Sequence, residues 1–384
     1  MKDKLISVID ELNTEYVKIW EDICNIESHW NNKEGVDAVG EYFIKYANER
    51  GWKVEVFPQE RVGNVVTLTM NPEVNAAPIA FSGHMDTVHE KGSFGYPPVK
   101  VDWENDRIYG PGTTDCKGGL VVGFLAMEAL RRVGYNARPV VMYLQSDEES
   151  GGRLSADATI NHICEKAQGS VAFFNLEDSV KDQVCLGRKG IVSFEFTVTG
   201  VECHSSACAF AGANAILEAA YKIIELEKFK DNDGLTCCCT VINGGTVHNI
   251  IPGECKFTAN VRFTKMSQLD EFISTAQRLC EDIHVPGCKC KMVMPRMRPA
   301  MELCDRNIEL VNRMNEIWRE NGFEEVKYVS NAGGSDAANV SQSGVPTVDG
   351  MGNIGAFIHT PREYGRISSL AEYAKRLAVI AYNI

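Results

Sequence analysis

The sequence has no excess of basic residues. Its 384 residues include 39 Lys and Arg but 52 Asp and Glu, which gives a formal net charge of −13 at pH 7. A protein that binds nucleic acid needs a basic face that neutralises phosphates. The charge balance therefore argues against a nucleic-acid partner, although a local cleft can still oppose the global sign.

Long apolar runs are also missing. No stretch approaches the ~20 apolar residues that cross a bilayer, and residues 1–7 have neither an apolar leader core nor a small-residue cleavage pattern. We therefore expect no membrane partner and a cytoplasmic location. The 14 cysteines are then expected to be reduced core residues. Cys288 and Cys290 lack the second thiol pair of a zinc-finger site.

A chain of this length is too long for one ordinary core, so two domains are expected. Apolar runs at 65–70, 78–82, 139–144 and 171–176 are typical of buried strands, and helical spacing occurs at 2–23 and from 118 to 130. Strands that alternate with helices predict an α/β domain with a mixed, largely parallel sheet and flanking helices. Ligands bind beyond the carboxyl ends of such strands.

The pattern changes near residue 190. Residues 191–199 alternate with a period of two, which indicates a strand with one wet face. The elements that follow have the order β-α-β-β-α-β of a small two-layer α+β domain. We therefore predict an inserted domain at 191–297, within a catalytic metal-binding domain formed by 1–190 and 298–384.

Acid and imidazole side chains follow several apolar runs, where site residues are commonly held. The candidates as metal ligands are two imidazoles and three carboxylates: His84, Asp115, Glu149, Glu177 and His359. This set suits two divalent ions bridged by one carboxylate. Each residue alone is explained as well by a solvated turn, a helix cap or a hydrogen-bonded histidine. Their joint occurrence at element ends favours the metal hypothesis.

Two further carboxylates are candidates for catalysis. Asp86 lies two residues after His84, on the same face of a strand, and can accept the second ring N–H of a metal-binding histidine. Glu148 and its neighbour Glu149 point to opposite sides, so that one can bind metal while the other takes a proton from water.

Together these motifs resemble the di-zinc family of aminoacylase, acetylornithine deacetylase, succinyl-diaminopimelate desuccinylase and bacterial glutamate carboxypeptidase, over nearly the whole chain. The resemblance implies one zinc ion held by His84 and Glu177 and a second held by Glu149 and His359, with Asp115 bridging. Glu148 is then the general base. Leu176-Glu177-Asp178 lacks the Pro that many relatives have after the Glu, so Asp178 is a second candidate for that ligand.

The inserted domain is similar to the family's dimerisation or lid domain, which implies a homodimer. His204, in Gly200-Val201-Glu202-Cys203-His204-Ser205-Ser206, matches the histidine that reaches a neighbouring subunit's site and stabilises the oxyanion. Asn249 matches a substrate-facing Asn. Read without the resemblance, His204 is a surface histidine at a strand end.

Substrate-binding candidates come from the glutamate carboxypeptidase branch, to which the chain is most similar. Arg262 and Arg298, the latter before Pro299, are candidates for holding a carboxylate, because a guanidinium forms two parallel bonds with it. Gly333-Gly334-Ser335-Asp336 is similar to that branch's Gly-Gly-Thr-Asp loop and adds Gly334 and Ser335. The alternative for both arginines is a surface salt bridge.

The expected activity is metal-dependent hydrolysis of an amide bond next to a free carboxylate, which releases an amino acid from a peptide or N-acyl amino acid. An N-acyl amino acid deacylase with the same machinery is one alternative. A relative that has lost catalysis and only binds is another, and the complete ligand set argues against it. Two Zn²⁺ per subunit are expected, although the mixed ligands also suit one ion, or Co²⁺ or Mn²⁺.

Overall fold

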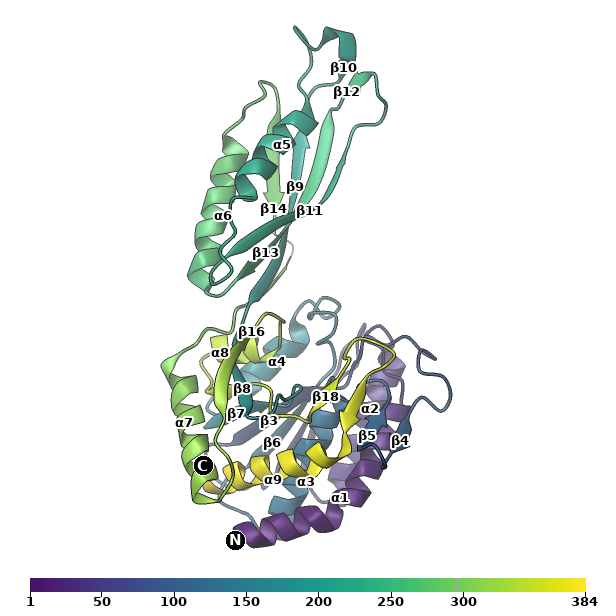
Figure 1. Cartoon of the computed structure of the whole chain (residues 1–384), viewed down its shortest axis with the longest axis vertical. Helices are drawn as coiled ribbons and strands as arrows, with labels where there is room; N and C mark the ends of the chain where they lie inside the picture. The colour runs from purple at the N-terminus through teal and green to yellow at the C-terminus, as the bar shows by residue number, and fades with distance from the viewer. Residues whose placement is uncertain (295) are drawn as a thin grey trace. The chain divides into compact units, whose positions relative to one another are not determined.

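The computed structural model describes residues 1–294 and 296–384 and divides into two compact units (Figure 1). The first unit comprises Met1–Leu186, Leu303–Ser330 and Ser335–Ile384, and the second comprises Gly187–Glu302 and Asn331–Gly334. The boundaries expected at 190 and 298 lie a few residues from these, and the short return of the chain at Asn331–Gly334 was not anticipated. None of the helices in the described residues is long and apolar enough to cross a membrane.

A six-stranded sheet forms the centre of the first unit, in the order β1-β2-β6-β3-β7-β17. Its strands are β1 (Lys53–Phe57), β2 (Val65–Met70), β3 (Ile79–His84), β6 (Val140–Gln145), β7 (Ala172–Asn175) and β17 (Thr347–Val348). β1 and β2 pair antiparallel, as do β2 and β6, whereas β6, β3, β7 and β17 run parallel. This confirms the predicted mixed, largely parallel sheet with flanking helices.

Helices pack around this sheet and bury the apolar side chains along one face of each helix. α3 (Lys117–Arg132) packs against α1 (Lys2–Asn25) and α9 (Ile367–Asn383), and nearly all of its residues are buried. α2 (Lys33–Glu49) packs on β1 and β2. The remaining helices of this unit are α4 (Ala158–Lys166), α7 (Asp305–Glu320) and the short α8 (Ala337–Gln342).

A small four-stranded sheet brings the C-terminal segment beside the middle of the chain. Its order is β18-β19-β5-β4, with β18 (Gly355–Ala356), β19 (Tyr364–Arg366), β5 (Arg107–Tyr109) and β4 (Lys100–Asp102). The loop between β18 and β19 carries His359, and the loop after β5 carries Asp115. Two more strands, β8 (Gln183–Arg188) and β16 (Lys327–Asn331), pair with each other.

The second unit is a two-layer α+β structure, as predicted. Its antiparallel sheet has the order β11-β13-β9-β14, with β15 (Met297–Arg298) also pairing with β9. The strands are β9 (Gly190–Thr199), β11 (Thr236–Gly244), β13 (Glu254–Phe263) and β14 (Lys289–Val293). Alternate residues of β9 are buried, which matches the period of two, and they contribute to a core with α5 (Ala215–Leu226) and α6 (Met266–Glu281). β10 (Cys203–His204) and β12 (Ile250–Ile251) form a separate small pair.

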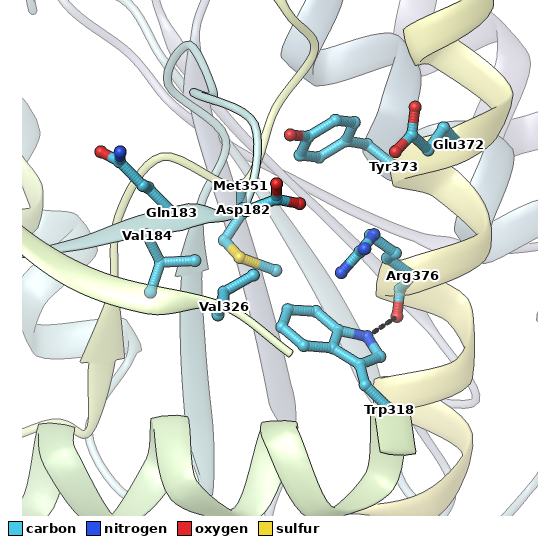
Figure 2. Close-up of a pocket in the computed structure, with 9 residues that line it drawn as sticks. All are labelled: Asp182, Gln183, Val184, Trp318, Val326, Met351, Glu372, Tyr373 and Arg376. Carbon is cyan, nitrogen blue, oxygen red and sulfur yellow. Dashed lines mark hydrogen bonds between the residues drawn. The ribbon is translucent and has the colours of Figure 1, made fainter. Parts of the chain in front are cut away.

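A small pocket of about 10 Å³ lies in the first unit between α7, α9 and β8 (Figure 2). The Trp318 indole N–H donates a hydrogen bond to the Arg376 carbonyl at 3.2 Å, and the Arg376 guanidinium lies 5.0 Å from the Trp318 ring centre. None of the predicted site residues lines this pocket. We therefore regard it as a consequence of the packing of α7 on α9.

Candidate metal centre

Three of the predicted metal ligands lie at the carboxyl ends of neighbouring parallel strands. His84 is the last residue of β3, Glu149 follows β6, and Glu177 follows β7. Since β6, β3 and β7 are adjacent and parallel, these ends meet at one edge of the sheet. The three side chains are almost completely buried.

The other two predicted ligands come from loops. Asp115 lies two residues before α3, where a Cβ added at Gly119 would lie 1.8 Å from the Leu176 carbonyl oxygen. Only glycine permits this approach, which brings the start of α3 to the end of β7. His359 adopts φ of 60°, a left-handed conformation that is rare outside glycine and that clusters at functional sites.

The Asp115 carboxylate lies between the two imidazoles. Its Oδ1 is 3.0 Å from His84 Nε2, and its Oδ2 is 3.0 Å from His359 Nε2. Each imidazole has a second carboxylate beside it, because His84 Nε2 is 3.7 Å from Glu177 Oε1 and His359 Nε2 is 3.4 Å from Glu149 Oε2. The structure therefore brings all five predicted ligands together and places Glu177 beside His84.

These distances fit ligands that share divalent ions. Two ligands about 2.0–2.1 Å from a tetrahedral ion lie ~3.3 Å from each other, close to the distances above. The ligand atoms of His84, Asp115 and Glu149 all lie within 4.8 Å of one another. Glu149 Oε1 is buried and has no hydrogen-bond partner among the described residues, which is costly unless a cation binds it.

The electrostatics also indicate that positive charge is needed here. Burial and the neighbouring Asp115 raise the pKa of Glu149 to about 8, and burial raises the pKa of Glu177 well above its usual range. Hydrogen bonds to Asp115 and Glu149 raise the pKa of His359 to about 10. Without a metal, the centre therefore retains protons at neutral pH that a bound cation would replace.

Asp86 is placed differently from the prediction. The ring Nδ1 of His84 donates to the main-chain carbonyl of Asp86 at 2.9 Å, while the Asp86 carboxylate is 3.5 Å away. A carbonyl only accepts, so Nδ1 carries a proton, and Nε2, which lies 3.0 Å from Asp115 Oδ1, is the nitrogen that faces the other ligands and can bind a metal once it gives up its own proton. The carboxylate accepts hydrogen bonds from the backbone N–H groups of Glu148 (3.3 Å) and Glu149 (3.0 Å). Asp86 thus also fixes the segment that carries the general-base candidate.

Comparison with known proteins identifies the family. The family model for peptidase family M20/M25/M40 matches residues 80–383, which include every predicted metal ligand. The chain belongs to this family. Carboxypeptidase G2 of Pseudomonas sp. (strain RS-16) is 27% identical over 360 residues, which are 92% of this chain and 85% of that protein.

Solved structures show the same fold at low identity. Aminopeptidase PepT from Bacillus cereus ATCC 10987 matches with a TM-score of 0.78 and 19% identity, over 96% of this chain and 98% of that chain. The YXEP protein of Bacillus subtilis, described as a dinuclear metal binding peptidase from the M20 family, matches with a TM-score of 0.72 and 17% identity, over 97% and 98%. Membership of the M20 family confirms the resemblance seen in the sequence and makes the protein a metallopeptidase or amidohydrolase.

The structure places two other predicted residues of this M20 protein together in the second unit. His204 ends β10 and is exposed, and its Nδ1 lies 2.8 Å from the Ser206 hydroxyl. The Asn249 carbonyl accepts a hydrogen bond from the Ser205 N–H at 2.9 Å. The two residues are therefore close neighbours, and their catalytic roles stay predictions.

The predicted substrate arginines lie in one row of the second unit's sheet. Arg262 on β13 and Arg298 on β15 pair with the same residue, Ile191 of β9, from its two sides. Side chains at such paired positions share a face of the sheet. Arg262 Nη1 donates to the Ala332 carbonyl at 3.4 Å, and a Cβ added at Gly334 would lie 2.6 Å from Arg298 Cδ. Gly334 therefore lies directly against the Arg298 side chain.

Ser335 is held by contacts within the first unit, and its predicted role in substrate binding stays a prediction. Its side chain is fully buried in the first unit, where the hydroxyl accepts hydrogen bonds from the Asn175 amide (3.1 Å) and the Ala337 N–H (3.2 Å). These contacts fix the start of α8. The Ser335 hydroxyl therefore supports the local structure through neighbours that the sequence pattern could not identify.

Two residues near the centre were missed. The Cys116 sulfur accepts a hydrogen bond from the His84 N–H at 3.2 Å and lies within 4.8 Å of ligand atoms of His84 and Glu177. Its position next to Asp115 was the available signal, but a buried cysteine is normally a core residue. Glu363 is the other missed residue, and no motif in the sequence distinguishes it.

Proposed function

We propose that this M20 protein hydrolyses an amide bond adjacent to a free carboxylate, as a glutamate-carboxypeptidase-like enzyme that releases an amino acid. The main support is the position of the Asp115 carboxylate, which directs one oxygen to the His84 ring and the other to the His359 ring. Glu177 lies beside His84, and Glu149 lies beside His359. This arrangement supports two divalent ions, held by His84 and Glu177 and by His359 and Glu149. A structural neighbour described as a dinuclear metal binding peptidase supports the same count, and zinc suits the N/O ligands.

When bound, such ions polarise the scissile carbonyl and lower the pKa of water. The protein's own contribution begins with Glu148, whose carboxylate takes a proton from the attacking water and passes it to the leaving amine. Glu148 is buried, and its charge adds to the raised pKa of both Glu149 and Glu177, so it lies beside the ligands. Asp86 holds the Glu148 backbone in place through its hydrogen bond.

Substrate recognition is assigned to the arginine pair of the second unit. Arg262 and Arg298 lie on either side of Ile191 on one face of the sheet. Two guanidinium groups in one row present paired donors that match a carboxylate. The similarity to carboxypeptidase G2 supports a carboxyl-terminal residue as the group held there.

A homodimer is also proposed, because the outer face of α5 is apolar. Ile216, Leu217, Tyr221 and Ile224 of α5 are exposed, and Val241 and Ile242 are exposed on β11, an edge strand of this unit's sheet as described. An exposed apolar helix beside an unpaired strand edge is suited to bind a second copy. In such a dimer His204 would donate to the oxyanion in the partner's site. An Ile224→Asp variant that is monomeric, retains its metals and stays fully active would sink that role.

Substrate turnover by purified, metal-loaded protein tests the proposed function. Dipeptides and N-acyl amino acids with a carboxyl-terminal glutamate are compared with the same compounds as carboxyl-terminal amides. We expect hydrolysis of the free acids only, and loss of turnover by about 10²–10⁴-fold in Glu148→Gln with metal content unchanged. Faster turnover of N-acetyl amino acids than of peptides would identify a deacylase. No turnover of either class by protein that has bound its metals would refute the proposal.

A further inference from the structure

Glu363 is a fully buried carboxylate that is not among the predicted metal ligands. Its Oε1 accepts hydrogen bonds from the backbone N–H groups of Thr114 at 2.8 Å and Asp115 at 3.1 Å. Its Oε2 lies 2.6 Å from Nε2 of His89, which is also buried. Since a carboxylate in these contacts can only accept, the His89 ring donates through Nε2.

These contacts connect three segments that carry metal ligands. His89 lies on the stretch that leaves β3 after His84, and Asp115 is contacted through its own N–H. Glu363 itself follows His359 on the same short loop. One buried side chain therefore holds together the chain segments of both imidazoles and of the carboxylate that lies between them.

Neighbouring hydrogen bonds reinforce the connection. The Thr114 hydroxyl donates to the Tyr364 carbonyl at 2.8 Å, and the Gly110 N–H donates to the Glu363 carbonyl at 3.4 Å. Tyr364 also pairs with Tyr109 where β19 meets β5. The loop that ends in Asp115 is thus held to the His359 segment at several points.

We propose that Glu363 is a positioning residue that sets the spacing between His84, Asp115 and His359. It contacts no substrate in this account and acts through the ligands. The inference rests on the proposed metal-dependent function. Residues that orient metal ligands typically change metal affinity or activity by about 10–100-fold when replaced, and we expect an effect of that size here.

The test uses the whole 384-residue chain in metal-free form, into which Co²⁺ is titrated in place of the native ions. Glu363→Gln keeps the size of the side chain but removes its charge, and Glu363→Ala removes the contacts altogether. The matched control is Glu128→Gln, because Glu128 is also buried in the first unit but pairs with Arg50, Arg131 and Arg132 instead. Co²⁺ affinity is measured by titration calorimetry, and the coordination geometry is measured by the visible absorption spectrum.

We expect both Glu363 variants to bind Co²⁺ about 10–100-fold more weakly, with Glu363→Ala the weaker, and to show an altered visible spectrum. Glu128→Gln should keep the affinity and spectrum of the unmodified protein even if its melting temperature falls. Unchanged affinity and spectrum in both Glu363 variants, with only a lower melting temperature, would overturn the inference. Failure of the unmodified protein to bind Co²⁺ would instead refute the proposed function.

Discussion

Buried glutamates in the two units have pKa values that are shifted in opposite directions. Glu218 of α5 is fully buried in the second unit, 2.5 Å from the Nζ of Lys222, and accepts hydrogen bonds from the N–H groups of His284 and Val285. Burial alone would raise its pKa, but the Lys222 ammonium and the N–H groups of Val285 and His284 together outweigh burial and lower the pKa below its usual value. This glutamate is ionised by a cation that the chain itself supplies.

Glu149 and Glu177 of the first unit are buried as well, but their pKa values are raised by burial and by neighbouring carboxylates. The histidines beside them do not reverse this shift. The difference shows how a structural ion pair can be told from a binding centre. Where the chain itself provides the compensating positive charge, the buried carboxylate stabilises the fold. Where it does not, the buried carboxylates are suited to bind a cation from solution.

The largest effect on stability is expected from Lys222→Met. This change leaves the Glu218 charge buried without its partner, and breaking such a pair costs about 3–5 kcal/mol. Denaturant unfolding should therefore show a strongly destabilised protein. The double variant Glu218→Leu with Lys222→Met removes both charges and should recover much of that loss. Equal stability of Lys222→Met and the unmodified protein would show that Glu218 is not held by this pair.

Replacing Glu218 or Glu149 by glutamine should change the free energy of unfolding of the metal-free protein by less, and in opposite directions. Glu218→Gln loses charge-assisted hydrogen bonds and should lower the free energy of unfolding by about 1–3 kcal/mol. Glu149→Gln removes a charge that the site disfavours, so metal-free stability should be unchanged or higher. The same variant should bind metal poorly. Destabilisation of the metal-free protein by Glu149→Gln would contradict the comparison.

Metal affinity should depend on pH because ligands in the first unit must lose protons before they bind metal, whereas Glu218 and Lys222 of the second unit play no part. In the metal-free protein the pKa of Glu149 is about 8 and that of His359 is about 10. Both groups therefore hold protons at pH 7 and must lose them to bind a metal, so affinity should rise from pH 6 to pH 8, by up to ~tenfold per pH unit for each proton released. Calorimetry in buffers of different ionisation enthalpy counts these protons. Glu149→Gln should release one fewer, and pH-independent affinity would contradict the assignment.

The strand-end ligands could be predicted because their location follows from local patterns. His84, Glu149 and Glu177 each follow an apolar run, and parallel strands bring such positions to one edge. Alternation along β9 likewise predicted the two-layer second unit. These features need only the sequence of one segment and the general geometry of sheets.

Other features depend on partners that lie far away in the chain. Glu363 receives hydrogen bonds from a loop almost 250 positions earlier, and Ser335 is buried against Asn175. The shared pairing of Arg262 and Arg298 with Ile191 depends on strand register across the sheet. No local pattern encodes these long-range contacts, so the sequence did not indicate Glu363, indicated the two arginines only weakly, and could not predict the contacts of Ser335.

Metal content is the most direct test of the central claim that the first unit's carboxylates and imidazoles hold two divalent ions. Mass spectrometry would be applied to protein purified without chelator, beside an Asp115→Ala variant that removes the carboxylate between His84 and His359. We expect about two ions per chain and a large reduction in the variant. No bound metal after addition of zinc, manganese or cobalt, or equal metal content in both proteins, would contradict it.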